Sequence, residues 1–389
     1  MNLLAVIAGL IACAGILQGL FGWALVHRFH AAAPPAGGVR PAITVLKPLH
    51  GAEPLLEQAL ETLFRQDYRQ FQIVFGVQSP LDPAIAVVER LAARFPDADT
   101  ALVADGRLHG RNRKVGNLIN MLPAARHDVL VIADSDVHVA PDYLARIADA
   151  LAAPGVGLVT TLYAGLPATA TLAGRLGATA ITHGFLPGAL MARALGRQDC
   201  LGATMALTRE TLGAIGGLAV LVHHLADDHV LGRLVMARGL RVALAPTVPA
   251  TTVPETGFGE LYRHELRWSR TILSLAPSGF AMSVVQYPLL WAMLAAALSG
   301  GSDWAAALLL STWVARAAAG RGIDRLLGLA QDGLASRAPV WLLPLRDIMS
   351  VAVMLASYAS DEVEWRGQVL RASLIALPLD TRPLRTERR

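Results

Sequence analysis

Five apolar residues in a row, Val129 to Ala133, run directly into two carboxylates, Asp134 and Asp136. Such a run is typical of a parallel strand covered by helices on both faces, and ligands bind beyond the carboxyl ends of these strands. Alternate residues of a turning segment can point the same way, so both carboxylates can face one divalent cation or one ribose–diphosphate. The alternative is an Asx turn before the next helix, for which Pro141 is suitably placed.

The composition predicts membrane segments. Of 389 residues, 54% are hydrophobic and only 16% are charged, and the mean hydropathy is +0.45. This is too apolar for a purely soluble protein, although the length would allow two domains. The net charge of +4 fits cytoplasmic flanks beside anionic lipid. No arginine stripe interleaved with aromatic residues indicates a nucleic acid partner.

Lysine and cysteine are both rare in this chain. Lys47 and Lys114 are its only lysines, and every other permanent cation is arginine. This usage hints that a compact ammonium is needed at these two places, although a coding bias toward arginine would produce the same pattern. The two cysteines, Cys13 and Cys200, lie far apart and predict no disulfide framework, so we expect the polar part in a reducing compartment.

The first apolar stretch, Leu3 to Val26, contains no charge and is long enough to span a bilayer. His27, Arg28, His30 and Arg40 follow it. The positive-inside bias therefore predicts a transmembrane anchor over residues 1–27, an N-terminus outside, and a cytoplasmic domain after a short linker.

Strands alternate with amphipathic helices over residues 42–256, the predicted catalytic domain. The predicted strands cover residues 43–46, 73–77, 101–103, 129–133, 156–161, 202–207 and 241–244. This order predicts an α/β fold with a doubly wound, mostly parallel sheet and right-handed crossovers. Such a sheet would place Lys47, Asp82, Lys114 and Asp134 along one edge.

Two later segments are predicted to lie in the membrane surface. Residues 172–195 are apolar but carry arginines, a histidine and a proline, which favours an interfacial helix pair over a span. Residues 257–275 form an amphipathic helix with several arginines and aromatic residues, as expected at the lipid headgroups.

The region 280–360 is predicted to hold the C-terminal membrane helices. Its apolar runs cover residues 280–298, 304–319 and 340–358. The last run contains Pro344, Arg346 and Asp347, so it is expected to be broken or re-entrant. Four full spans would put the basic tail, residues 361–389, outside. We therefore expect one C-terminal run not to cross, and the tail to be cytoplasmic.

The polar residues suit a nucleoside diphosphate sugar. A carboxylate near the first strands can accept from the base or ribose, a metal held by Asp134 and Asp136 can bridge the diphosphate, and cations can meet the leaving charge. A further carboxylate must take a proton from the acceptor hydroxyl, and Asp228 is the candidate for that base.

These segments together resemble the family 2 and family 21 glycosyltransferases with a GT-A fold, including ceramide glucosyltransferases and bacterial hopanoid-associated glycosyltransferases. The resemblance runs from about Ile43 to Trp268 and continues more loosely through the C-terminal spans. Its motifs are Leu46-Lys47-Pro48-Leu49-His50-Gly51-Ala52-Glu53, Asp82-Pro83-Ala84-Ile85, Asn112-Arg113-Lys114-Val115-Gly116-Asn117-Leu118, Asp134-Ser135-Asp136, Ala226-Asp227-Asp228 and Arg267-Trp268.

The resemblance implies a role for each matching residue. Asp228 would be the catalytic base, since the family places its functional acid second in the Asp227-Asp228 pair. His264, where the family usually has Gln or Arg, would contact acceptor or diphosphate together with Arg267 and Trp268. Asp136, with Asp134, would hold Mg²⁺ or Mn²⁺. The residues expected to bind the nucleotide sugar are Lys47, Pro48, Glu53, Asp82, Lys114 and Asp134.

The segments around residues 102–120 and 264–268 look closest to the hopanoid-associated branch. This similarity implies an inverting enzyme of a bacterial inner membrane that moves N-acetylglucosamine from its UDP donor to bacteriohopanetetrol. A ceramide glucosyltransferase is the alternative. A processive polysaccharide synthase is the first rival class, and a non-catalytic membrane scaffold that has kept the fold is the second.

Overall fold

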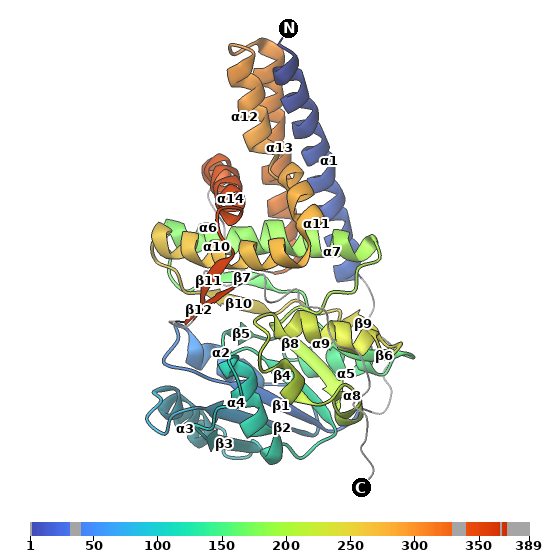
Figure 1. Ribbon diagram of the computed structural model, residues 1–389, viewed down its shortest axis with the longest axis vertical. Helices are drawn as coiled ribbons and strands as arrows, with labels where there is room; N and C mark the ends of the chain where they lie inside the picture. The colour runs from blue at the N-terminus through green and yellow to red at the C-terminus, as the bar shows by residue number, and fades with distance from the viewer. Residues whose placement is uncertain (1, 32–39, 329–339, 366–367, 372–389) are drawn as a thin grey trace.

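The computed structural model describes residues 2–31, 40–328, 340–365 and 368–371. Figure 1 shows three layers: an α/β domain, a layer of helices lying across it, and a bundle of upright helices that includes the N-terminal helix. The predicted linker at 33–38 and most of the predicted tail at 361–389 lie outside the described residues.

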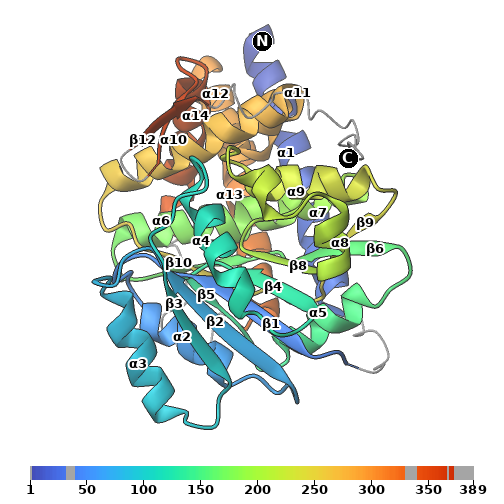
Figure 2. The same cartoon turned by 60° about the horizontal axis from the view of Figure 1, so that its bottom comes forward.

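The central sheet has the order β3-β2-β1-β4-β8-β6-β9 (Figure 2). Its strands are β1 (Ile43–Pro48), β2 (Phe71–Val77), β3 (Thr100–Ala104), β4 (Val129–Ala133), β6 (Val156–Thr160), β8 (Thr204–Thr208) and β9 (Arg241–Leu244). Neighbouring strands from β3 to β4 are parallel, as are β6 and β9, while β8 runs antiparallel between β4 and β6. The predicted mostly parallel α/β sheet is confirmed.

Helices cover both faces of this sheet, which explains the unbroken apolar strands. Along β4, Val131 points into a core with α2 (Leu56–Phe64), α3 (Ala84–Arg94) and α5 (Tyr143–Leu151). Its neighbours Leu130 and Ile132 point into a second core on the other face. Helices α4 (Arg113–Met121), α8 (Arg209–Ala214) and α9 (Asp227–Met236) contribute to that core. Every residue of β4 is therefore buried.

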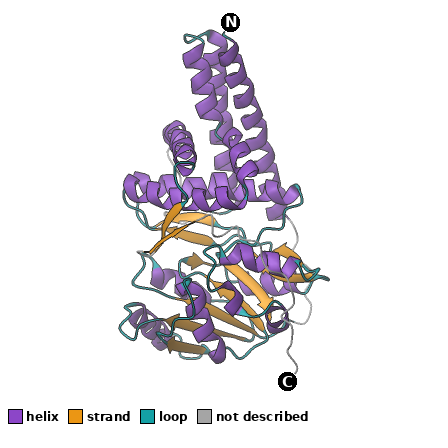
Figure 3. Ribbon diagram, viewed as in Figure 1, coloured by secondary structure: helices purple, strands orange, loops and turns teal. Residues whose placement is uncertain are grey.

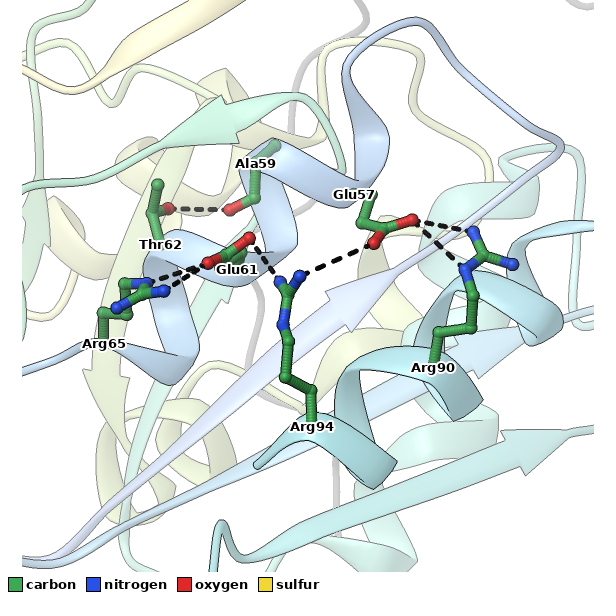
Figure 4. A network of polar contacts seen from close by, with 7 residues as sticks. All are labelled: Glu57, Ala59, Glu61, Thr62, Arg65, Arg90 and Arg94. Atoms are coloured by element: carbon green, nitrogen blue, oxygen red, sulfur yellow. Dashed lines mark hydrogen bonds and ion pairs between the residues drawn. The ribbon is translucent and has the colours of Figure 1, made fainter. Parts of the chain in front are cut away.

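A network of ion pairs joins the outer surfaces of α2 and α3 (Figure 4). Glu57 pairs with Arg90 at 2.7 Å, and Arg94 pairs with both Glu57 and Glu61. Arg65 pairs with Glu61 at 2.6 Å along α2. These side chains are partly or largely exposed, so the ion pairs link the surfaces of the two helices but add little to the free energy of unfolding.

A small second sheet lies between the domain and the helical layer. It has the order β5-β10-β7, with β5 (Val137–His138), β7 (Ala164–Pro167) and β10 (Ala250–Val253). The sequence patterns did not predict these strands, because segments of two to four residues are too short to show an alternation.

The helical layer differs in one respect from the prediction. The expected interfacial helix pair at 172–195 is one continuous helical run: α6 (Leu172–Ala180), a π turn η2 (Ile181–Phe185) and α7 (Leu186–Ala194). Pro187 does not break the run, because the π turn directly before it changes the spacing of the backbone hydrogen bonds at that point. The predicted amphipathic helix at 257–275 is α10 (Phe258–Leu275), which lies across the domain in Figure 1.

The half of the molecule that contains the candidate membrane helices, the membrane-facing half, consists mostly of helices (Figure 3). The upright helices α1 (Leu3–Ala31), α12 (Pro288–Leu298) and α13 (Asp303–Leu326) pack side by side. Within the described ranges, α1 and the segment Val340–Ser357 are long and apolar enough to cross a membrane. A third span results if Pro277–Gln286 and Pro288–Leu298 count as one bent helix.

The predicted break near Pro344 is wrong. Pro344 lies in the first turn of α14 (Leu343–Ser357), where its missing N–H costs nothing, and the helix continues. The bend lies instead before Pro288, between η4 (Ser283–Gln286) and α12, in a pair bent by 64°. The start of the predicted tail also differs, because β11 (Glu362–Trp365) and β12 (Gln368–Arg371) form an antiparallel hairpin.

Gly165 provides a test of how β7 packs beneath the helical layer. A Cβ at this position would lie 2.5 Å from the Ala178 Cα of α6 and 2.8 Å from its carbonyl oxygen. Gly165→Ala should therefore destabilise the protein by about 1–3 kcal/mol, as overpacking does. Thermal unfolding in detergent measures this loss. Gly213→Ala is the control, because a Cβ on that helical glycine meets no atom within 4 Å. Equal melting temperatures for the two variants would contradict the close packing.

Candidate active site

Two lysines and a carboxylate meet where the parallel strands end. Lys114, in the first turn of α4, lies 2.6 Å from the Asp134 carboxylate and 4.0 Å from that of Asp227. Lys47, at the end of β1, is fully buried, and its Nζ donates to the backbone carbonyl of Asp134. The predicted gathering of these residues at one edge of the sheet is confirmed.

The turn that carries Asp134 and Asp136 leads into β5, not into a helix. Asp142, not either of these carboxylates, occupies the N-cap position of α5. The Asx-turn alternative is therefore excluded. The hydroxyl of Thr251 in β10 donates to the Asp136 carboxylate, and the Ser135 hydroxyl donates to Glu53.

Asp227 and Asp228 begin α9, where the positive end of the helix dipole favours carboxylates. Asn112 Nδ2, at the N-cap of α4, donates to Asp227 Oδ1 at 3.2 Å. Asp228 Oδ1 accepts the His229 N–H at 2.7 Å. A Cβ on Gly202 would lie 3.0 Å from Asp228 Oδ2, so the glycine leaves room beside that oxygen.

The carboxylates at this edge disturb one another's titration. Burial and the nearby Asp227 raise the pKa of Asp228 to about 7, and burial and Asp134 raise the pKa of Asp136 to about 6. For Lys114, burial favours the neutral form, but Asp134 and Asp227 outweigh it and raise the pKa above its ordinary value. The site thus combines a permanent cation with an acid that can exchange a proton near neutral pH.

A second polar group lies on α10. His264 Nδ1 donates to Glu255 Oε1, and the two rings of His264 and Trp268 meet edge to face at 4.6 Å. Burial opposes the charge of Glu255, but His264 and Arg267 lower its pKa, so Glu255 is ionised at neutral pH. His264 is thereby paired with a carboxylate that the sequence patterns did not reveal.

Tyr163 interacts with both polar groups: its ring packs in one cluster with Trp268, and the carboxylates at the strand ends affect its titration. Its ring stacks on Phe185 at 4.6 Å, and both rings pack with Trp268 against Val253 and the α6–η2 run. Burial raises the pKa of Tyr163, and the charges of Asp228, Asp134 and Asp136 raise it further.

Three predicted donor-binding residues lie deeper than expected. Asp82 accepts backbone N–H bonds from Gly51 at 3.0 Å and Ala84 at 2.9 Å, and it is 8% exposed. Pro48 is buried in β1. Lys47 is buried beneath the turn, so its ammonium meets backbone carbonyls, and burial lowers its pKa to about 8. In this geometry Lys47 shapes the turn from below.

The sequence pattern of "Glycosyl transferase family 21" matches residues 4–374, nearly the whole chain. The chain belongs to this family.

Individual relatives agree with this assignment. The chain is 39% identical to a ceramide glucosyltransferase of Komagataella phaffii over 114 residues, which are 28% of this chain and 22% of the yeast protein. It is 26% identical to ceramide glucosyltransferase 1 of Caenorhabditis elegans over 231 residues, which are 58% of this chain and 48% of the nematode protein. The matched region thus spans less than half of each of these relatives.

A solved structure supports the fold. A mannosyltransferase from Pyrobaculum calidifontis, in complex with GDP-Man and Mn²⁺, superposes with a TM-score of 0.53. The two proteins are 22% identical, and the alignment covers 92% of this chain and 99% of the other.

The named curated relatives favour the ceramide alternative over the hopanoid assignment, which is not confirmed.

The carboxylates of Asp134 and Asp136 fit a divalent cation in this family 21 protein. No cluster of three His, Cys, Asp or Glu side chains suited to a metal occurs within the described ranges. Asp134 and Asp136 do provide two carboxylates close enough to raise a pKa, and oxygen ligands suit Mg²⁺ or Mn²⁺. Mg²⁺ commonly takes one or two protein carboxylates and completes its shell with phosphate oxygens and water.

Several residues of the site were not predicted as functional. Asn112 belongs to a quoted motif but was given no role, and three further residues lie outside the motifs: Tyr163, Thr251 and Glu255. Asn112 could have been singled out, because it precedes a helix and stands beside Lys114. Glu255 gave no sequence signal, since it follows a short strand that was itself missed.

The raised pKa of Asp228 predicts a pH-dependent cost of folding. The group binds its proton more tightly in the folded state, so its cost grows from about pH 4 to pH 7 and then stays constant. Asp228→Asn removes the charge but keeps an oxygen to accept the His229 N–H. The variant should gain on the order of 2–4 kcal/mol at pH 8 relative to wild type, and little at pH 4. Unfolding curves in detergent with EDTA measure this difference, and a pH-independent gain would contradict the assignment.

Proposed function

We propose that the protein transfers a sugar from a UDP-sugar donor to the hydroxyl of a ceramide-type lipid at a membrane surface. The observation that carries the proposal is the ion pair of Lys114 with Asp134 at 2.6 Å, beside the Asp227-Asp228 pair at the start of α9. Burial and Asp227 raise the pKa of Asp228 to about 7, and α10 carries the Arg267-Trp268 pair. Donors of this kind have an anionic leaving group, and their acceptors must lose a proton.

The proposed reaction is a single inverting displacement. The acceptor oxygen forms a bond to the anomeric carbon, while the bond to the UDP oxygen breaks and UDP leaves. Asp228 takes the proton of the acceptor hydroxyl, for which a pKa of about 7 is well matched. A divalent cation held by Asp134 and Asp136 would neutralise diphosphate charge.

The remaining site residues support this reaction in different ways. Lys114 and Arg267 supply positive charge for the diphosphate. His264 donates to Glu255 from Nδ1, so Nε2 of the neutral ring, which has no partner among the described residues, can accept a hydrogen bond. Asp82 and Glu53 would border the nucleotide. Lys47 and Pro48 would shape the floor of the donor site rather than contact the donor.

Two lipids are candidates for the acceptor. Ceramide is supported by the named relatives, and bacteriohopanetetrol, with N-acetylglucosamine as the sugar, by the likeness of residues 102–120 and 264–268 to the hopanoid-associated branch. Two candidate spans in the described part of the chain, or three with the bent pair, support a membrane location. We further propose a bacterial inner membrane, with the catalytic domain on the cytoplasmic side.

The proposed function makes two predictions, of which the first concerns the product. Purified protein in detergent is supplied with UDP-glucose or UDP-N-acetylglucosamine, and with ceramide or bacteriohopanetetrol. Mass spectrometry should detect hexosylceramide. A hexosamine adduct of the hopanoid would move the protein to that branch with the same chemistry. Asp228→Asn is the folded control and should lose turnover. Absence of product from every pairing, in protein that binds UDP, would reject the transferase proposal.

The second prediction concerns the metal. Asp136→Asn keeps an acceptor for the Thr251 hydroxyl but removes the charge, so it should lower metal-dependent turnover by about 100-fold or more. Thr251→Val is the matched control, because it removes this hydrogen bond and leaves the charge of the carboxylate. Titration of activity with Mn²⁺ and Mg²⁺ measures both. Equal metal titrations for Asp136→Asn and wild type would transfer the ligand role elsewhere.

A further inference from the structure

An ion pair between a buried arginine and a partly buried glutamate lies on the side of α10 that contacts α14. Arg346 of α14 is 1% exposed, and its two terminal nitrogens donate to the two oxygens of Glu265 at 2.6 and 2.7 Å. This two-pronged geometry fixes direction as well as distance, which a single charge contact does not. Arg346 Nη1 also lies 3.4 Å from the Leu176 carbonyl of α6.

Glu265 stands between the functional residues of α10. His264 and Trp268 are one helical turn apart, contact one another, and face Glu255 and the core that contains Tyr163. Glu265 follows His264 directly, so it points about 100° away around the helix axis. Helix α10 is therefore held from two directions, by Glu255 below and by Arg346 from the membrane side.

The next residue of α14 anchors the pair to the upright helices. Asp347 is fully buried, accepts the Leu289 N–H of α12 at 3.1 Å, and pairs with Arg316 of α13 at 2.9 Å. Two consecutive residues thus connect α10 to α12 and α13. A single turn of α14 therefore links α10 to the upright helices α12 and α13.

Stability alone does not require the Arg346–Glu265 pair. Burying two charges costs desolvation free energy, and well-packed apolar residues of similar volume commonly serve the fold as well or better. What apolar residues cannot supply is a fixed rotation of α10, because their contacts are not directional.

We propose that Arg346 is a positioning residue: through Glu265 it sets the rotation of α10 and so aims His264 and Trp268 at the site of sugar transfer. The inference rests on the proposed function in that the aimed groups serve the transfer reaction. It adds a residue of α14, about 80 positions further along the chain, to the determinants of that site.

The test replaces the ion pair that reaches α10 by uncharged residues in the full-length protein, as Glu265→Leu with Arg346→Met. The matched control, His183→Gln with Asp324→Asn, removes another largely buried polar pair, which joins η2 to α13 instead of α10. The first variant should lose at least about 10-fold in kcat, with its melting temperature near that of the control and its Kd for UDP within about threefold of wild type. The control should keep its kcat.

A double-mutant cycle with His264→Ala separates aiming from general damage. In wild type, removing His264 should lower kcat strongly, whereas in the Glu265→Leu, Arg346→Met background it should cost little more. An equal loss in both backgrounds would overturn the proposal, as would unchanged kcat in the double variant.

Hydrogen exchange of the α10 amides gives a readout that does not depend on turnover. Exchange in this helix should accelerate in the Glu265→Leu, Arg346→Met variant and not in the matched control. If wild type forms no product from any substrate pair, the proposed function fails, and exchange alone then decides the positioning role. Equal exchange in the two variants would overturn it.

Discussion

The candidate site depends on balancing negative charge with two ammonium groups. Asp134, Asp136, Asp227 and Asp228 lie together here, and burial, together with neighbouring carboxylates, raises the pKa of each of the last three. Lys114 meets two of these carboxylates from above, and Lys47 holds the backbone of the Asp134 turn from below. The chain's only two lysines are therefore both used here. An arginine's planar fork would need several acceptors arranged around it, whereas a small ammonium fits between a buried strand end and a carbonyl.

The placement of most of the site could be predicted from strand ends. An apolar run covered on both faces fixes where a chain must turn, so Lys47, Asp82 and Asp134 were predictable as neighbours. Their orientation was not predictable. Whether Lys47 points outward or under the turn depends on the register between β1 and β4, which pair Leu46 with Ile132. That register emerges from packing, not from residue type.

The membrane-facing half was harder to predict for a different reason. Proline and charge within an apolar segment were interpreted as interruptions at Pro344, Arg346 and Asp347. In the structure the proline starts a helix and each charged residue has a partner far away in sequence. A sequence pattern detects a charge but not its partner, so Glu265 and Glu255 were both missed although they join helices or loops to the site.

The close approach of β7 and α6 has a consequence for how a lipid would meet this protein. With no side chain between Gly165 and the Ala178 backbone, β7 of the small sheet and α6 of the helical layer are in close main-chain contact, so a shift of one is passed to the other. The proposed reactive edge would then keep its depth beneath the helical layer, which we expect to rest on the lipid headgroups. Selection among acceptors would accordingly include the height at which a hydroxyl stands above the bilayer, a property of the lipid in its membrane and not of its isolated structure.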